Sequence, residues 1–422
     1  MARKLYTLLW WLALPFVPLR LAWRARREPG YRHAIGERLG RCTTPRPAGE
    51  VVWVHAVSLG ETRAAAPLIE RLLAKRPRAT VLLTCMTASG REAGRAYVGG
   101  GVVQAWLPYD VPFAVRAFLR HWSPSAGLLM ETELWPNLAH ECRARGVPLF
   151  LVNARMSAKS AAGYARFSGL ARPMLASLAG VAAQTDADAR RLRELGAAEV
   201  AVTGNLKFDV AIAPGMRERA LPMRERFGST RRVLLCASTR EGEEALLLDA
   251  LARKPLPGDA LVVLVPRHPQ RFDEVDALLR SRGVASVRRS ADSPVGPDVR
   301  VVLGDTMGEM LAYCAAADVA FVGGSLLPLG GQNLIEPIAL GVPVLVGPHT
   351  FNFAEATERA VEAGAALRVK DADALVAQAA ELLADDGARA RMREAALAFH
   401  AQHRGAADKL WAWLAPRLPS PA

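Results

Sequence analysis

The sequence predicts an α/β fold with two Rossmann-like domains facing a cleft, preceded by a membrane-anchoring helix at the N-terminus. Its 422 residues are enough for two domains of about 200 residues each. Short apolar runs alternate with amphipathic helical stretches on both sides of a polar break, and the first residues form the most lipid-like stretch of the chain.

The N-terminal segment, residues 1–27, is predicted to hold the chain at a membrane. Residues 5–23 read LYTLLWWLALPFVPLRLAW, with basic residues on both sides. The uncharged run that ends at Leu19 is shorter than a full span of about 20 residues, and Pro15 and Pro18 should kink it. A cleaved signal peptide is disfavoured because no small-residue cleavage site follows, and a buried core helix is a further alternative. The following arginines favour anionic headgroups and a cytoplasmic body, but spanning and lying in the interface both stay open.

Ten continuous apolar runs indicate parallel strands that are covered by helices on both faces. Those in the predicted first domain, residues 28–210, are VVWVHAV (51–57), TVLLTCM (80–86), SAGLLME (125–131), PLFLVNAR (148–155) and GVAAQT (180–185). Those in the predicted second domain, residues 232–400, are RVLLCAS (232–238), ALVVLVPR (260–267), VRVVLGD (299–305), VAFVGGS (319–325) and VPVLVG (342–347). Residues 211–231 show no strand signal and are predicted to be a linker. Residues 372–415 show a helical pattern and are expected to pack on the two halves or cross between them, and residues 401–422 are predicted to be a C-terminal helical segment.

Composition narrows the classes of partner. The net charge of +13 comes mostly from scattered arginines, which suits nucleic acid, anionic lipid or a phosphorylated ligand. No zinc-finger spacing, RNP-like aromatic motif or basic zipper occurs, so nucleic acid is not expected as a partner. The five cysteines are far apart and form no CxxC pair, so neither a disulfide framework nor a zinc site is expected.

The first candidate site follows the apolar run at 51–57. In HAVSLGE, His55 ends the predicted strand and Glu61 opens a helix. A carboxylate there could act as a general base on an acceptor hydroxyl, and the helix dipole should keep it ionised. The alternative is structural, because Ser58 and Glu61 have the S-x-x-E spacing of a capping box.

Two further loops of the first half carry charged residues at strand ends. METELWPN (130–137) places Glu131 and Glu133 directly after an apolar run, with a solvated acidic loop as the alternative interpretation. TGNLKFD (203–209) adds Lys207. A cation near a departing phosphate would stabilise the negative charge that develops there.

The second half has comparable loops. LVPRHPQRF (264–272) places Arg267 and His268 at a strand end, although a rigid surface turn explains the same pattern. Glycine pairs within 321–337 let the backbone approach a ligand, and helix N-termini favour phosphate. Glu336 could accept from ribose hydroxyls or could cap a helix. No Walker A, ordered GxGxxG or HExxH motif occurs, so neither a metal nor a bound cofactor is expected.

At these residues the sequence closely resembles the 3-deoxy-D-manno-octulosonic acid (Kdo) transferases of lipopolysaccharide synthesis. The shared motifs follow one another along nearly the whole chain: HAVSLGE, TASG (87–90), LPYD (107–110), METELWPNL, NARMS, GNLKFD, STREGEE, PRHP, GDTMGEM, GGQNLIEPIALGVPVLVGP and FNF (351–353).

The resemblance implies a GT-B glycosyltransferase with an acceptor domain followed by a CMP-sugar domain. It implies inverting transfer of Kdo from CMP-Kdo to the lipid A precursor, a tetra-acylated disaccharide bisphosphate, on the cytoplasmic face of the inner membrane. It also implies that Glu61 is the general base and that Glu131 and Lys207 stabilise the transition state. The residues matched to CMP binding are Arg267, His268, Met307, Gly308, Glu309, Asn333, Leu334, Ile335 and Glu336.

Two other functions are weighed against this one. A nucleotide-sugar 2-epimerase on the same fold needs no lipid acceptor, so the N-terminal segment argues against it. A non-catalytic, membrane-bound nucleotide-sugar binding protein has no need of a carboxylate at Glu61, which weighs against that function.

Overall fold

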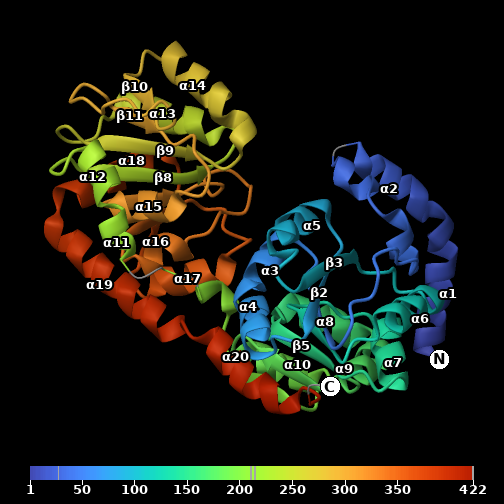
Figure 1. Cartoon of the computed structure of the whole chain (residues 1–422). Coiled ribbons are helices and arrows are strands. Elements are labelled where there is room, and N and C mark those ends of the chain that lie inside the picture. Colours follow the sequence, from blue (N-terminus) through green and yellow to red (C-terminus); the bar gives the residue numbers. More distant parts are fainter. Residues whose placement is uncertain (27, 210–211, 213–214, 421–422) are drawn as a thin grey trace. The chain divides into compact units, whose positions relative to one another are not determined.

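The protein folds into two compact units, each a parallel sheet covered by helices (Figure 1). The computed structural model describes residues 1–26, 28–209, 212 and 215–420. Unit 1 comprises Met1–Asp209 and Arg404–Ala422, and unit 2 comprises Val210–His403. The α/β prediction is confirmed. The domain boundaries predicted at residues 27, 210, 211 and 422 lie outside the described residues.

Unit 1 contains a seven-stranded sheet in the order β3-β2-β1-β4-β5-β6-β7, with all neighbours parallel. Its strands are β1 (Val51–His55), β2 (Thr80–Cys85), β3 (Val102–Trp106), β4 (Ala126–Met130), β5 (Leu149–Ala154), β6 (Gly180–Ala183) and β7 (Val200–Val202). The strand order reverses between β1 and β4. Loops that leave the carboxyl ends of strands at such a switch point are where α/β sheets bind ligands.

Helices cover both faces of this sheet. They are α3 (Leu59–Ala64), α4 (Ala66–Lys75), α5 (Ala88–Gly94), α6 (Pro112–Trp122), α7 (Pro136–Ala144), α8 (Ala158–Arg166), α9 (Ser168–Leu175), α10 (Asp186–Glu194) and α20 (Ala406–Leu414). Short 3-10 turns are η2 (Pro29–Arg32), η3 (Ile35–Leu39), η4 (Arg95–Tyr97), η5 (Leu206–Phe208) and η7 (Ala415–Arg417). Because residues alternate between the two faces of a strand, Val51 and Trp53 of β1 enter one core while Val52 and Val54 enter the other.

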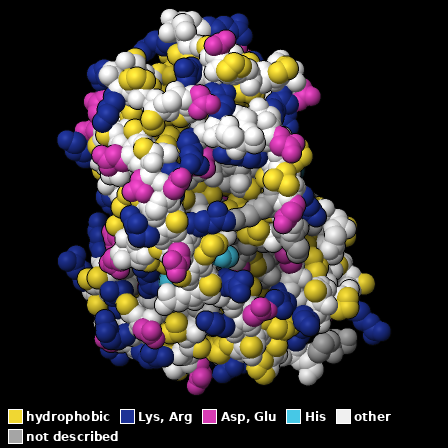
Figure 2. All heavy atoms as spheres, turned by 90° about the vertical axis from the view of Figure 1, so that its left-hand side faces the viewer, with side chains coloured by type: hydrophobic (Ala, Val, Ile, Leu, Met, Phe, Trp, Pro, Cys, Tyr) yellow, Lys and Arg dark blue, Asp and Glu magenta, His cyan; other side chains and the backbone are white. Residues whose placement is uncertain are grey.

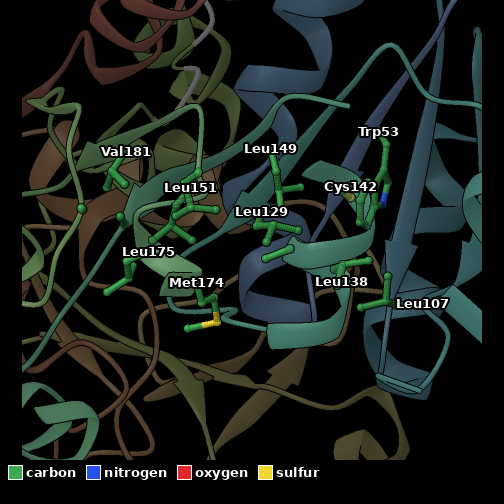
Figure 3. Close-up of a cluster of buried hydrophobic side chains, with 14 of the residues drawn as sticks. Trp53, Leu107, Leu129, Leu138, Cys142, Leu149, Leu151, Met174, Leu175 and Val181 are labelled. Carbon is green, nitrogen blue, oxygen red and sulfur yellow. The ribbon is translucent and has the colours of Figure 1, made fainter. Parts of the chain in front are cut away.

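Figure 3 shows the first of these cores. Trp53, Leu129 and Leu149 project from the strands toward Leu138 and Cys142 of α7, and all five side chains are buried. This packing fixes β1 and β4 next to each other and thereby fixes the two loops that leave them.

The chain returns to unit 1 at its C-terminus. Ala406, Leu410 and Leu414 of α20 lie in the second core of unit 1, and the Trp413 ring meets Phe150 edge-on at 5.9 Å. The Asp209 carboxylate accepts from backbone N–H groups at the start of α20 and so caps this helix. Asp209 is the last residue of the first segment of unit 1.

Unit 2 contains a second seven-stranded parallel sheet, in the order β10-β11-β9-β8-β12-β13-β14. Its strands are β8 (Val233–Thr239), β9 (Leu261–Pro266), β10 (Ser286–Arg288), β11 (Val301–Leu303), β12 (Val319–Val322), β13 (Val344–Val346) and β14 (Ala366–Arg368). Its helices are α11 (Met216–Arg219), α12 (Leu221–Phe227), α13 (Glu243–Arg253), α14 (Phe272–Ser281), α15 (Met310–Ala316), α16 (Ile335–Ala339), α17 (Ala354–Glu362), α18 (Ala372–Ala384) and α19 (Asp386–His403), with η6 at Pro269–Arg271. The switch point lies between β8 and β12. The region expected as a linker, 211–231, includes α11 and α12, and Met223 and Phe227 of α12 are buried in the core of unit 2.

The apolar start of the chain is a helix of 24 residues that we call the N-terminal helix, Ala2–Ala25. It consists of α1 (Ala2–Ala13), a 3-10 turn η1 (Leu14–Phe16) and α2 (Val17–Ala25), so the α-helical pattern is interrupted at Pro15 as expected. By length and composition it could cross a membrane. Only Leu21 and Ala25 of it are buried, which argues against a core helix.

Basic residues are dispersed over the surface. Figure 2 shows Lys and Arg side chains spread over the viewed face and interspersed with Asp and Glu. On this face the basic side chains therefore do not form one continuous patch of the kind that binds nucleic acid.

Candidate active site

Glu61 lies at the start of α3, in the loop that leaves the carboxyl end of β1. Its carboxylate accepts from the Val57 backbone N–H at 2.8 Å and from the Ser58 hydroxyl at 3.0 Å. The Glu61 N–H in turn lies 3.4 Å from Ser58 Oγ, so the capping interaction predicted as the structural alternative is present. These contacts fix the carboxylate in one orientation.

Burial opposes the ionisation that the helix dipole favours at Glu61. Burial raises its pKa from 4.5 to about 7, and the nearby Glu131 and Glu133 carboxylates add to the rise. The hydrogen bonds from Val57 and Ser58 act in the opposite direction, but burial is the larger effect. A pKa near 7 suits a general base at neutral pH, because such a base must take up a proton in one step and lose it in the next.

Glu131 and Lys207 form an ion pair beside Glu61. The distance from Lys207 Nζ to Glu131 Oε1 is 2.9 Å, and both side chains are partly exposed. Glu131, the first residue after β4, has a φ of +57°, which a residue with a side chain rarely adopts. Such strained positions concentrate at functional sites.

Asn153 holds the turn that carries Lys207. It is the last residue but one of β5 and has a φ of +51°, and its buried side-chain oxygen accepts from the Leu206 N–H at 2.9 Å. The amide of Gln184 donates to the Asn153 carbonyl at 2.9 Å. These hydrogen bonds join the end of β5 to the residue after β6 and to the turn that carries Lys207.

Glu133 belongs to the same group of charges. Its carboxylate accepts from the Trp135 indole at 2.9 Å, and its Oε2 lies 4.0 Å from Nε2 of His55. Burial raises the pKa of Glu133 to about 7. Burial lowers the pKa of His55 to about 3, so the imidazole is neutral and its Nδ1 shares a hydrogen bond of 2.9 Å with the Thr84 hydroxyl.

The structure thus brings Glu61, Glu131 and Lys207 together from three separate motifs. It adds Glu133 and His55, to which no role was assigned from the sequence, although the spacing of the two glutamates in METELWPN was a signal for Glu133. Among the described residues no group of three or more His, Cys, Asp or Glu side chains is placed to hold a metal ion.

In unit 2, Glu243 organises the loops at the switch point. Its buried carboxylate accepts four backbone N–H groups at 2.6–3.0 Å, those of Arg240, Gly324, Ser325 and Leu326. A Cβ on Gly323 would lie 2.6 Å from the Ser238 carbonyl, so only glycine permits this approach. Because Glu243 takes the N–H groups of 324–326, those groups are not available for a phosphate.

Arg267 and His268 lie in a cationic environment. Burial and the neighbouring charges of Arg240, Arg267 and Arg271 lower the pKa of His268, which is therefore neutral at pH 7. Nε of Arg267 donates to the Gln332 side chain at 3.2 Å, which ties the PRHP loop to the loop before α16. Arg267, the cation predicted at the end of this strand, therefore lies beside the glycine-containing segment 321–337.

The other residues that the resemblance assigns to CMP binding differ in exposure and in hydrogen bonding. Leu334 and Ile335 are buried in the core, so their side chains are closed to a donor. The Asn333 side chain accepts from the Ile335 N–H at 3.0 Å and donates to the Glu336 carboxylate at 3.0 Å.

The GDTMGEM loop places its residues differently. Glu309 is paired with Arg289 at 3.0 Å and accepts from the Thr306 hydroxyl. The Met307 side chain is exposed, and Gly308 has a φ of +83° that favours glycine.

Comparison with known proteins gives first the class and then the family. The structure is similar to a glycosyltransferase from Rickettsia africae, with a TM-score of 0.57 and 13% identity over 88% of this chain and 98% of that one. It is also similar to a putative UDP-N-acetylglucosamine 2-epimerase from Listeria monocytogenes, with a TM-score of 0.54 and 15% identity over 87% and 95%. At these identities the likeness shows only the fold. Residues 288–399 match the family model "Glycosyl transferases group 1", and two doubly wound units of this kind make up the GT-B glycosyltransferase fold.

The family follows from the sequence matches. Residues 33–210 match the family model "3-Deoxy-D-manno-octulosonic-acid transferase (kdotransferase)". The chain is 48% identical to a 3-deoxy-D-manno-octulosonic acid transferase of Bordetella pertussis, over 98% of this chain and 100% of that protein. It is 35% identical to one of Haemophilus influenzae, over 99% of both chains. The chain therefore belongs to the 3-deoxy-D-manno-octulosonic acid (Kdo) transferase family.

Proposed function

We propose that the protein transfers Kdo from CMP-Kdo to the lipid A precursor of lipopolysaccharide, with inversion at the anomeric carbon and release of CMP. We place the reaction at the cytoplasmic face of the inner membrane. The observation that carries the proposal is the held, half-buried carboxylate of Glu61 beside the Glu131–Lys207 pair. Membership of the Kdo transferase family supports the sugar, and the apolar N-terminal helix supports a lipid acceptor.

In the proposed step, Glu61 removes the proton from an acceptor hydroxyl. The oxygen forms a bond to the anomeric carbon of Kdo while the bond from that carbon to the CMP phosphate oxygen breaks. One displacement from the face opposite the leaving group inverts the configuration. The pKa of about 7 matches the base to this task at neutral pH.

Lys207 is proposed to stabilise negative charge in the transition state. Glu131 holds its ammonium group at 2.9 Å and so fixes the cation before the substrates bind. Positive charge that is already in position lowers a barrier because it requires no rearrangement during the reaction.

Unit 2 is proposed to hold CMP. The arginines around His268 would meet the phosphate, and the Asn333–Glu336 pair would meet the ribose hydroxyls. Since the chemistry assigned here uses side chains alone, we expect transfer to continue in the presence of a chelator.

The test compares Kdo transfer by the wild type, Glu61→Gln and Glu61→Ala, using CMP-Kdo and the lipid A precursor with product detection by mass spectrometry. Glutamine can still accept from the Val57 N–H and donate to Ser58 Oγ, so it preserves the cap and removes the base. We expect both variants to lose about 10²–10⁴-fold in rate, while the exposed Glu70→Gln has none of this effect. Activity that survives in Glu61→Gln removes Glu61 as the base, and absence of transfer by the wild type overturns the proposed reaction.

A further inference from the structure

One face of the N-terminal helix is docked on unit 1. Arg3 and the hydroxyl of Thr7 both donate to the Asn137 side chain, at 3.2 and 3.0 Å. The Trp10 ring lies 5.7 Å from the ring of Tyr109. These residues share one side of α1 because they follow at helical spacing.

The docking continues along α2. Leu21 and Ala25 are buried in a small cluster with Tyr31, against which Ala88 of α5 also packs. The Arg24 guanidinium lies over the Tyr31 ring, 5.1 Å from its centroid. Both ends of the helix are therefore attached to the body of unit 1, and Figure 1 shows α1 running beside it.

The docked face reaches the loop that carries Glu131. Asp110 is buried and accepts from the N–H groups of Asn137 and Leu138, at 2.9 and 2.8 Å, where α7 begins directly after this loop. The Tyr6 hydroxyl of the N-terminal helix donates to the same carboxylate. Withdrawal of the helix would leave a buried carboxylate without this partner.

The opposite face of the helix is apolar and uncovered. Its exposed side chains are those of Leu5, Leu8, Leu9, Leu12, Phe16 and Leu19. Lys4, Arg20 and Arg26 are exposed around it and form no ion pair within the described part of the chain. No acidic residue occurs before Glu28. An apolar face bordered by cations is the pattern of a helix that lies in an anionic membrane surface.

We infer that the N-terminal helix stays docked on unit 1 and lies in the plane of the membrane interface, bound to anionic lipid headgroups, and that it does not span the bilayer. This inference deepens the membrane placement of the proposed function and rests on it, but it does not depend on the acceptor's identity. At about 36 Å the helix is long enough to cross. Crossing, however, would take Arg3, Tyr6 and Thr7 away from their partners into hydrocarbon, where unpaired polar groups are costly. Lying flat preserves every docking contact and buries the apolar face.

The orientation of the N-terminus tests the inference directly. Lys4→Cys is labelled with a membrane-impermeant maleimide in inverted inner-membrane vesicles and in spheroplasts, and Glu70→Cys on the body serves as the matched control. The native cysteines are buried except for the half-buried Cys42, which is replaced in the background. We expect both positions to react in inverted vesicles and neither in spheroplasts. Reaction of Lys4→Cys in spheroplasts, or its failure to react in inverted vesicles, overturns the inference.

Binding to vesicles tests the stated partner. Purified protein is floated with vesicles of phosphatidylcholine alone or mixed with phosphatidylglycerol. We expect salt-sensitive preference for the mixed vesicles and about a fivefold weaker affinity for each of Lys4→Gln and Arg20→Gln. Equal affinity for both kinds of vesicle overturns the headgroup assignment. Because these variants leave the residues around Glu61 untouched, Kdo transfer to detergent-dispersed acceptor should be unchanged. If transfer is absent while the labelling result holds, the proposed reaction fails and the inference stands.

Discussion

The Glu61→Gln substitution separates the cost of burying a carboxylate from its use in catalysis. In the wild type, burial raises the pKa of Glu61 from 4.5 to about 7, which means that the folded chain disfavours the charged form. Glutamine carries no charge and can keep the contacts with Val57 and Ser58. The variant that loses activity should therefore be the more stable protein at neutral and alkaline pH.

The size and the pH window of this effect follow from the two pKa values. Between pH 4.5 and about 7 the folded chain keeps a proton on Glu61 that the unfolded chain has lost, so the stability contributed by this group falls as pH rises through that window. At 1.4 kcal/mol for each unit, the upper bound is about 3 kcal/mol. Glu61 is only half-buried and keeps some contact with water, so we expect a gain of about 1–2 kcal/mol above pH 7 and none below pH 4.5.

Thermal unfolding, followed by tryptophan fluorescence between pH 4 and pH 8, measures the effect. We expect the Tm of Glu61→Gln to exceed that of the wild type by about 2–6 °C at pH 8 and to equal it at pH 4. Glu70→Gln, at an exposed position of α4, is the control and should show no such trend. A Tm difference that does not change with pH, or a variant that is less stable at pH 8, would refute the burial argument.

Three other changes should have distinct effects. Lys207→Ala should lower kcat for Kdo transfer about 10²–10³-fold but change the free energy of unfolding by less than about 1 kcal/mol, because the ion pair with Glu131 is partly exposed; a large loss of stability would instead make the lysine structural. Arg267→Ala should raise the KM for CMP-Kdo and weaken CMP binding in calorimetry more than it lowers kcat, and unchanged CMP affinity would remove this arginine from the donor site. Glu243→Gln should destabilise unit 2 by about 2–4 kcal/mol in denaturant titrations, because a single amide oxygen cannot accept four buried N–H groups; near-wild-type stability would show that the loop is held by other contacts.

Sequence reasoning located the interior of both sheets but not their edges. All ten apolar runs are interior strands, while β3, β7, β10 and β14 are the four edge strands. An edge strand has a neighbour on one side only and is less fully covered: Gln104 in β3 and all of β10 are only half-buried. Continuous apolarity marks strands that are covered on both faces, so it cannot find the others.

The positions of the candidate site residues could be predicted from the sequence, but the pKa of Glu61 could not. The motifs placed Glu61, Glu131 and Lys207 at strand ends, and the parallel sheet brings those ends together. The helix dipole favours an ionised Glu61, but burial raises its pKa to about 7, and burial depends on tertiary packing that the local sequence does not show. His55 was assigned only as the end of a strand, and its approach to Glu133 depends on the adjacency of β1 and β4.

The packing of the C-terminal segment could not be predicted from the local sequence either. A helical pattern was evident before residue 415, but the sequence does not show that α20 leaves unit 2 and packs on the sheet of unit 1. The cap that Asp209 places on this helix joins residues almost 200 positions apart. Such long-range partners are fixed by the folded topology and leave no local signal.

The most direct test of the account is the pH dependence of kcat/KM for Kdo transfer by the wild-type protein. If Glu61 is the base and burial sets its ionisation, kcat/KM should rise with pH and reach half its maximum near pH 7 on the acidic side. If kcat/KM instead reaches half its maximum near pH 4.5, the usual pKa of a glutamate, then the claim that a buried Glu61 with a raised pKa is the base is contradicted.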